Sequence, residues 1–258
     1  MSENLKFKMI NDHVGELVLS QPKRRNALNA AMWAGLPGIL KTAEETKGIK
    51  VLIVRGDGDH FASGADISEF ETLYATEESA RKISDDIAAG FKALAEFPFP
   101  VIGLVRGACV GGGCGLALCC DLRFADTTSK FAITPNKLGL VYPFSDVQRL
   151  IETVGVPHAK DMLFSARLVL VAEALDMGLI NRLCPVDDLE NTVLEYALNI
   201  ASLSTQSAKT TKKMFAAHSN GQRTETIESE AWFLSGFSSR DFQEGYKAFL
   251  EKRKPDFK

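Results

Sequence analysis

The chain has 258 residues, of which 45% are hydrophobic and 24% are charged, and its formal net charge is −3. This length and composition indicate one large globular domain, or one domain with an appendage, and exclude a small disulfide-stapled fold or a disordered chain. Since charges of both signs are mixed along the chain, no global field favours nucleic acid or an anionic membrane surface, and we expect neither partner.

Short apolar runs alternate with helical stretches in the first half of the chain. The runs are rich in Val, Ile and Leu and end in turn-forming residues, as buried strands do. The predicted strands are Val14–Leu19, Val51–Val54, Val101–Val105 and Leu122–Ala125. The predicted helices between them are Ala30–Glu45, Glu77–Glu96 and Gly112–Cys120. This alternation is typical of an α/β fold with parallel strands and crossover helices.

Helical patterns dominate from about Pro157 to the end of the chain. The predicted helices are Ala159–Phe164, Ala172–Met177, Asp188–Leu203, Ala208–Ala217 and Ser239–Leu250. We therefore divide the chain into a core of residues 1–195 and a helical C-terminal region of residues 196–258.

The chain carries no pattern typical of membrane insertion, secretion or metal binding. Its apolar stretches are shorter than the roughly 20 residues of a membrane-spanning helix, and charges interrupt residues 1–19, so we expect a cytoplasmic protein. Its five cysteines lie in apolar surroundings without C-x-x-C spacing, which predicts buried free thiols and no metal site.

Two glycine-containing segments are candidate binding loops. Gly111, Gly112 and Gly113 lead directly into an apolar helix, where free N–H groups, the helix dipole and the missing Cβ atoms suit an anionic ligand. Close helix packing explains these glycines equally well. The segment lacks the Gly-Lys-Ser/Thr and G-x-G-x-x-G contexts, which argues against a phosphate-binding loop or a dinucleotide-binding fold.

The second segment, Phe61–Ile67, follows the strand Val51–Val54. Loops at the carboxyl ends of parallel strands meet at one edge of a sheet, so one N–H from each glycine segment can converge on a single oxygen. The alternative for this segment is a plain turn in which Asp66 caps the following helix.

Four sequence blocks, in this order and spacing, resemble the crotonase superfamily, also called the enoyl-CoA hydratase/isomerase family, over nearly the whole chain. The blocks are Gln21–Asn29, Phe61–Ile67, Pro100–Asp121 and Ala248–Pro255. The resemblance implies a spiral of ββα units with a helical C-terminal trimerisation region, and a homotrimer or homohexamer. It also implies an acyl-CoA thioester as ligand, with no cofactor beyond the CoA moiety and no metal.

The resemblance also assigns roles to individual residues. The backbone N–H groups of Ala65 and Gly112 match the family's oxyanion hole, which polarises the thioester carbonyl and stabilises an enolate. The residues that match the nucleotide-binding positions are Lys23, Arg24, Ala27, Ala62, Asp66 and Ile67, and those that match positions reaching CoA from a neighbouring subunit are Phe249 and Lys252. For the cationic residues, the alternative is a solvated surface charge.

The chain departs from the family at the positions that carry acid–base chemistry. Hydratases of the family have glutamates where this chain has Gly115 and Asn136, and other members use an aspartate where it has Pro143. Since glycine and asparagine cannot transfer protons at pH 7, the ordinary hydration mechanism is not expected. The missing side chain at Gly115 predicts open space beside the thioester for a bulkier or more polar acyl group.

Tyr142 and Asp146 are the remaining candidates near the acyl group. Tyr142 is placed similarly to a tyrosine of methylmalonyl-CoA decarboxylase, where a phenol can orient a departing carboxylate; its alternative is an aromatic pocket wall without a chemical role. The alternative for Asp146 is an N-cap. Weaker candidates, each with an exposed surface position as alternative, are Glu69, Glu71, Tyr74 and His60.

We therefore expect an acyl-CoA lyase or isomerase of fatty acid metabolism that works through a stabilised enolate. The reaction is left open between isomerisation, decarboxylation, hydrolysis and an unusual hydration. One alternative is a methylmalonyl-CoA-decarboxylase-like activity. Another is a non-catalytic CoA-ester-binding protein, which the empty carboxylate positions favour.

Overall fold

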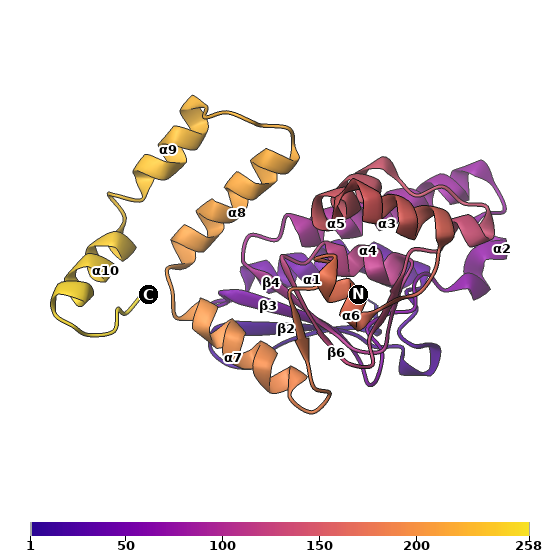
Figure 1. Ribbon diagram of the computed structural model, residues 1–258, viewed down its shortest axis with the longest axis horizontal. Helices are drawn as coiled ribbons and strands as arrows, with labels where there is room; N and C mark the ends of the chain where they lie inside the picture. Colours follow the sequence, from indigo (N-terminus) through magenta and orange to yellow (C-terminus); the bar gives the residue numbers. More distant parts are fainter. Residues whose placement is uncertain (1, 258) are drawn as a thin grey trace.

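Two β-sheets form the centre of the fold (Figure 1). The structure is a computed structural model and describes residues 2–257. The larger sheet has the order β1 (Leu5–Met9), β2 (Val14–Leu19), β3 (Val51–Gly56), β4 (Val101–Val105), β6 (Leu122–Asp126) and β9 (Arg182–Cys184). The smaller sheet has the order β5 (Ala108–Val110), β7 (Lys130–Ala132) and β8 (Val169–Leu170). In the larger sheet β1 pairs antiparallel with β2 and all other neighbours are parallel, so crossover connections join them.

Helices cover both faces of the larger sheet. One face carries α1 (Ala30–Glu45), α3 (Glu77–Ala95), α4 (Gly112–Leu118) and α5 (Phe144–Ser165), and the other carries α7 (Leu189–Ala201) (Figure 1). The short helices are α2 (Phe70–Leu73) and α6 (Val171–Asp176), with 3-10 turns η1 (Pro22–Arg24), η2 (Ile67–Glu69) and η3 (Pro135–Leu138). Helices on both faces explain why the parallel strands are apolar at nearly every position.

The hydrophobic core has two parts because successive strand residues point to opposite faces of the sheet. In β3, Leu52 and Val54 pack in the cluster with α1, α3, α4 and α5, whereas Val51 and Ile53 pack in the cluster with α7. The five cysteines lie inside this core and all are free, which confirms the prediction of buried thiols. Burial raises the pKa of Cys119 to about 12, so its thiol stays protonated at neutral pH.

A helical arm follows α7 and extends away from the sheets (Figure 1). It consists of α8 (Thr205–Ser219), α9 (Ile227–Ser235) and α10 (Arg240–Leu250). Lys212 on α8 ties the arm to the core by donating to Asp121 at 2.7 Å. Aromatic side chains of α9 and α10 remain exposed, among them Phe233, Phe242 and Phe249. None of the helices described within residues 2–257 is long and apolar enough to cross a membrane.

The predicted elements agree with the structure in the parallel sheet and differ at its margins. All four predicted strands are confirmed, and α1 has the predicted bounds. The strands β1, β5, β7, β8 and β9 and the helices α2 and α9 were not predicted. Helix α5 begins at Phe144, close to the helix start expected near Asp146, and it continues across a break at Gly155 into the helix predicted at Ala159–Phe164. Helix α7 continues across residue 195 and packs on the sheet as far as Ala201.

Candidate functional site

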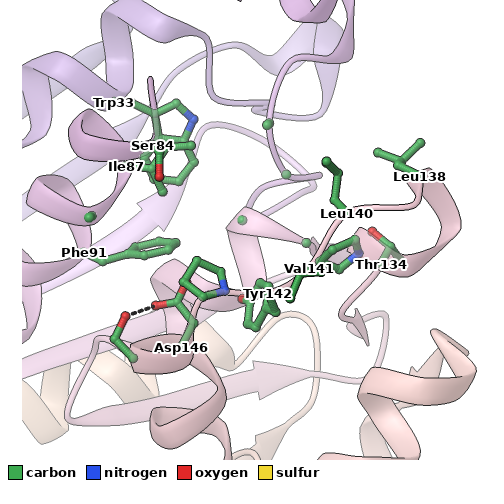
Figure 2. A pocket seen from close by; sticks show the side chains of 18 of the residues that line it. Trp33, Ser84, Ile87, Phe91, Thr134, Leu138, Leu140, Val141, Tyr142 and Asp146 are labelled. Atoms are coloured by element: carbon green, nitrogen blue, oxygen red, sulfur yellow. Dashed lines mark hydrogen bonds between the residues drawn. The ribbon is translucent and has the colours of Figure 1, made fainter. Parts of the chain in front are cut away.

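A cavity of about 620 Å³ opens between α1, α3, the N-terminal end of α5 and the loops that follow β3 and β5 (Figure 2). Its wall is largely apolar and aromatic, with a few polar groups. The apolar lining includes Trp33, Phe70, Ile87, Phe91, Leu138 and Leu140, and the polar lining includes Ser84, Lys92, Glu96, Tyr142, Asp146 and Arg149. An apolar cavity with a few converging polar groups is the usual form of a small-molecule site.

The two predicted glycine loops lie side by side at one edge of this cavity. The N–H of Ala62 donates to Ala108 O at 3.0 Å, and Val110 N donates back to Ala62 O at 2.9 Å, so the first loop runs parallel to β5. Gly64 has a φ of +108°, and a Cβ added there would lie 3.6 Å from Gly112 N. A left-handed φ and this close approach explain why glycine stands at residue 64.

Hydrogen bonds on either side of Ala65 set the direction of its N–H. Leu28 N donates to Gly64 O at 2.7 Å, and Asp66 N donates to Leu28 O at 2.9 Å. In an extended backbone adjacent peptide groups point to opposite sides, so the N–H of Ala65 points away from Leu28. Ala65 itself lines the cavity.

The N–H of Gly112 lies close to that of Ala65. Gly112 opens α4, ahead of the hydrogen bond that Gly115 N donates to Gly111 O at 3.0 Å, so its own N–H has no acceptor within the helix. A Cβ added at Gly112 would lie 3.7 Å from Ala65 N. Neither N–H has an acceptor among residues 2–257, and the structure therefore places two unpaired donors together at the cavity.

The expected open space beside Gly115 is absent, and that prediction is wrong. A Cβ added at Gly115 would lie 2.7 Å from Phe91 Cζ and 2.8 Å from Tyr142 Oη. These two aromatic side chains fill the volume that a larger residue would take. The hydroxyl of Tyr142 is buried there and has no hydrogen-bond partner in the described part of the chain. Burial raises the pKa of Tyr142 well above its usual range, so the phenol stays protonated.

Asp146 is a buried carboxylic acid in the cavity wall. It lies in the first turn of α5, where Figure 2 shows it in the cavity wall, and it accepts hydrogen bonds from Arg149 Nη1 at 3.0 Å and from Ser145 Oγ at 3.5 Å. Burial raises the pKa of Asp146 above its usual value of 3.8, and Arg149 offsets part of this effect. The interpretation of Asp146 as an N-cap is wrong, because Pro143 holds that position and the Asp146 side chain turns inward.

Asn136 lies outside the cavity lining and has a structural contact instead. Its amide nitrogen donates to the carbonyls of Leu163 and Phe164, both at 2.9 Å, near the end of α5. A glutamate at residue 136 cannot donate these hydrogen bonds while it is ionised. Packed aromatic rings therefore surround Gly115, and a helix-end contact holds Asn136.

The weaker candidates are distributed around the site. Glu69 accepts from Ala30 N at 2.7 Å at the start of α1. Tyr74 lines the cavity, whereas Glu71 is exposed and does not. His60 is half-buried, and its Nδ1 accepts from Ala108 N at 3.1 Å, so it joins the loop after β3 to β5 rather than lying free on the surface.

The predicted nucleotide-binding residues gather on the loops beside the cavity mouth. Arg24 Nη1 contacts the carboxylate of Asp66 and also donates to Ser68 Oγ at 2.7 Å. Burial alone would raise the pKa of Asp66, but hydrogen bonds from Ser68 and Arg24 lower it below its usual range. Asp66 accepts from Ser68 N and so caps η2, as its alternative interpretation predicted.

The remaining members of this predicted set differ in exposure. Lys23 is exposed, Ala27 and Ala62 are buried, and Ile67 is exposed at the cavity. Phe249 and Lys252 lie at the far end of the arm and do not reach the cavity of their own chain (Figure 1).

Trp33 is one of the cavity-lining residues that the sequence did not indicate. It lines the cavity, packs edge-on against Phe91 with ring centroids 5.3 Å apart, and is almost wholly buried. Its indole Nε1 has no acceptor within residues 2–257. In the sequence it continues the apolar face of a helix, a pattern that does not separate a site residue from a core residue.

Within residues 2–257 no cluster of three or more His, Cys, Asp or Glu side chains could hold a metal ion.

Comparisons with known proteins find close similarity over the whole chain. The model of the family described as "Enoyl-CoA hydratase/isomerase" matches residues 9–258. A crotonyl-CoA hydratase from Syntrophomonas wolfei is 34% identical over 93% of each chain. A probable enoyl-CoA hydratase from Rhizobium meliloti is 33% identical over 95% of this chain and 94% of its own. The crystal structure of an enoyl-CoA hydratase/isomerase family protein from Hyphomonas neptunium is 42% identical, with a TM-score of 0.95 over 99% of this chain and 97% of that one.

Proposed function

Because the chain belongs to the enoyl-CoA hydratase/isomerase family within the crotonase superfamily, we propose that it binds an acyl-CoA thioester in the cavity and stabilises its enolate. The α/β fold matches crotonase-fold structures, and the relatives support an enzyme that acts on acyl-CoA.

The pair of unpaired N–H groups on Ala65 and Gly112 is the observation that carries this proposal. Both donors lie at the cavity and are held by backbone hydrogen bonds, so they need no rearrangement to receive a carbonyl oxygen. When the thioester loses an α proton or a carboxylate, negative charge develops on that oxygen. Preorganised donors at such a position lower the barrier, and loss of one typically costs roughly 10²- to 10³-fold in rate.

Asp146 is the acid–base group that we assign to the reaction. It lines the same cavity, Arg149 fixes its orientation, and its raised pKa brings it closer to neutral pH. In the proposed isomerisation the carboxylate removes the α proton, the electron pair moves into the enolate, and the same group returns the proton at the γ carbon. A single carboxylate suffices for this transfer, whereas hydration needs a second group to activate water.

Decarboxylation is a second candidate, and the buried hydroxyl of Tyr142 favours it. That hydroxyl has no partner within residues 2–257, so it is free to donate to a carboxylate on the acyl group once the ring moves. The bond to the carboxylate carbon breaks, CO₂ leaves, and the electron pair becomes the enolate. No strong base is required.

The CoA portion extends toward the cations at the cavity mouth. Lys23 and Arg24 are exposed there and suit the phosphates of the nucleotide. Phe249 and Lys252 contribute from a second copy of the chain in a homotrimer or homohexamer, since within one copy they lie far from the cavity (Figure 1).

Turnover of an acyl-CoA panel by matched Gly112 variants tests the proposal. The panel holds enoyl-, hydroxyacyl-, malonyl- and methylmalonyl-CoA esters, with products read by mass spectrometry. Gly112→Pro removes the N–H and is expected to cost roughly 10²- to 10³-fold. Gly112→Ala keeps the N–H but brings a Cβ within 3.0 Å of Trp33 Cζ2, so it is expected to lose some activity, though less than Gly112→Pro. Circular dichroism confirms that both variants fold.

Two further variants distinguish the reactions. Asp146→Asn abolishes isomerisation, and Tyr142→Phe abolishes decarboxylation. Equal activity of the two Gly112 variants would contradict the oxyanion hole. Tight binding of CoA esters without product from any member of the panel would contradict an enzyme and favour a CoA-ester-binding protein.

A further inference from the structure

One hydrogen bond between the two glycine loops is accepted by a side chain in place of the backbone. Ala62 N donates to Ala108 O at 3.0 Å and Val110 N donates to Ala62 O at 2.9 Å, as in two parallel strands. One step further back, this pattern would pair Ala108 N with the carbonyl of His60. That carbonyl instead accepts from Asn26 Nδ2 at 2.6 Å, and Ala108 N donates to His60 Nδ1 at 3.1 Å. The imidazole therefore replaces a backbone acceptor.

The backbone around the imidazole leaves room for it in this position. Gly107 has a φ of +49°, and a Cβ added there would overlap His60 Nδ1 and Asp59 O. Phe61 N, next along the chain from His60, donates to Arg106 O at 2.8 Å. The imidazole is thus held against the backbone of Gly107, where only glycine admits it.

The hydrogen bond from Ala108 requires a neutral imidazole. A backbone N–H only donates, so Nδ1 of His60 carries no proton and the ring proton lies on Nε2. After protonation, Nδ1–H and Ala108 N–H are two donors that face each other, and the contact is lost. His13 provides a contrast, because its Nδ1 lies 3.0 Å from the carbonyl oxygen of Gly48, which accepts from the neutral and the protonated ring alike.

The charged groups around the imidazole have other partners. Those of the packed elements are Arg55 of β3, Arg106 after β4, Asp126 of β6 and Glu190 of α7, and those of its own loop are Asp57 and Asp59. Arg55 pairs with Glu16 at 2.8 Å, and Arg106 pairs with Glu190 at 3.2 Å. Asp57 accepts from Ser20 Oγ at 2.7 Å, and Asp59 is exposed. Within residues 2–257 no carboxylate forms an ion pair with His60, so none holds a protonated ring in place.

We propose that neutral His60 is a positioning residue for the oxyanion hole, and that protonation of its imidazole shifts the two glycine loops apart. Ala65 follows Ala62 by three residues and Gly112 follows Val110 by two, so the hydrogen bonds between the loops set the spacing of the two donors. A displacement of about 1 Å in a catalytic group can cost 10²-fold in rate. The effect on turnover rests on the proposed function, since it requires an acyl-CoA thioester at these donors.

Two amide resonances report this spacing without any substrate. Labelling with ¹³C′-glycine and ¹⁵N-alanine selects Gly–Ala peptide bonds, and the chain has two, Gly64–Ala65 and Gly107–Ala108. The two signals are therefore the donor to His60 and one donor of the oxyanion hole, and Ala65→Ser assigns them. The chain has four histidines, so the imidazole signal that is missing in His60→Asn identifies the titration of His60.

We expect both amide signals to move on acidification with the midpoint of the His60 titration. In His60→Asn the side-chain Oδ1 replaces Nδ1 as an acceptor that does not titrate, and neither signal moves at that midpoint. Circular dichroism checks that the chain stays folded throughout. An Ala65 signal that stays still at that midpoint, or one that moves equally in His60→Asn, overturns the inference.

Kinetics at neutral pH supply a second readout. His60→Leu removes the acceptor and is expected to lower kcat about tenfold with KM little changed, whereas His60→Asn keeps the acceptor and nearly the full kcat. The control His13→Asn, at the opposite end of the sheet, keeps full activity. Acidification lowers turnover of the wild type through His60 in addition to Asp146, and His60→Asn retains only the part due to Asp146.

Failure of the proposed function has a different signature. His60→Leu with unchanged kcat, in a protein that Gly112→Pro inactivates, overturns the positioning role and leaves the proposed function standing. A wild-type chain that turns over no acyl-CoA overturns the proposed function, and the amide titration then still decides whether His60 sets the spacing of the loops. If His60→Leu does not fold, the titrations of the wild type and His60→Asn settle the inference alone.

Discussion

Asp146 combines a buried carboxyl group with a raised pKa, and this gives activity a predictable pH dependence. The carboxylate is the form that removes a proton, so kcat/KM of the wild-type chain rises with pH through the pKa of Asp146, above the usual 3.8. The residual activity of Asp146→Asn lacks this rise. A pH–rate series on both proteins, with the best substrate of the panel, measures the difference.

The free energy of unfolding is expected to change with pH in the opposite direction to kcat/KM. Between 3.8 and the raised pKa the folded chain binds more protons at Asp146 than the unfolded chain, so the free energy of unfolding falls as pH rises through this range. Urea unfolding of wild type and Asp146→Asn across that range tests the sign. A wild-type chain that gains stability at Asp146 with rising pH would show that Arg149 outweighs burial.

The crowded position of Gly115 predicts a coupled stability effect with Tyr142. In Gly115→Ala the new Cβ lies within 3 Å of Phe91 and Tyr142, and such overpacking typically costs about 1–3 kcal/mol. Tyr142→Phe deletes the hydroxyl in contact and also removes an unpaired buried group. We therefore expect Gly115→Ala to cost less in the Tyr142→Phe background than in the wild type.

Chemical unfolding of the wild type, Gly115→Ala, Tyr142→Phe and the double variant forms a double-mutant cycle, which gives the coupling free energy between the two positions. Independent effects of the two substitutions would mean that the hydroxyl and the added methyl group do not meet. Gly115→Glu is expected to restore no hydration of crotonyl-CoA while both aromatic rings stay in place.

The sequence indicated the parts of the candidate site that depend on local backbone conformation. It did not indicate the parts that depend on side chains distant in the sequence. The free N–H groups of Ala65 and Gly112 follow from glycine loops after parallel strands and from the resemblance to the family. Phe91 belongs to a helix remote in sequence from Gly115, so no local pattern showed that it fills the neighbouring space. The orphaned N–H of Trp33 depends in the same way on which acceptors the folded chain fails to provide.

At the scale of the elements, α5 contains a break that glycine alone accommodates. Gly155 has φ 74° and ψ 163°, a conformation that other residues adopt at a cost of about 1–3 kcal/mol. Gly155→Ala should lower the free energy of unfolding by that amount, and thermal unfolding measures it. The control is Gly38→Ala in α1, which has open space around the added Cβ and should raise stability by about 0.5–1 kcal/mol. Equal effects of the two substitutions would contradict the strain at Gly155.

The accuracy of the element prediction depends on the length and surroundings of each element. Strands buried on both faces, such as β3 and β4, form unbroken apolar runs and were found. The short strands β5, β7, β8 and β9 have two or three residues each, too few for a periodic pattern. The missed strand β1 alternates between apolar and polar residues, which is the pattern of an edge strand.

At the scale of the whole molecule, the aromatic surface of the arm predicts self-association. Four aromatic rings of α9, α10 and the segment between them form a row in which each ring contacts the next, and all four are exposed in a single copy of the chain. They belong to Phe233, Phe237, Phe242 and Tyr246. Exposed apolar patches of this kind typically mark an interface. In analytical ultracentrifugation the Phe233→Glu variant should sediment as a single chain to a larger extent than the wild type does.

The control for this experiment is Lys213→Glu, an exposed position on α8 that gains a negative charge without loss of an aromatic ring. A wild-type protein that sediments as one chain at all concentrations would contradict the predicted assembly. Loss of acyl-CoA affinity together with the oligomer would support the contribution of Phe249 and Lys252 from a second copy.

The niche shared by Gly115, Phe91 and Tyr142 also makes the tolerance of residue 115 depend on two distant positions. A larger side chain at residue 115 fits only if both aromatic rings shift or become smaller. Residues 91, 115 and 142 therefore form one unit for mutagenesis, whereas Asp146 can be exchanged without repacking that niche.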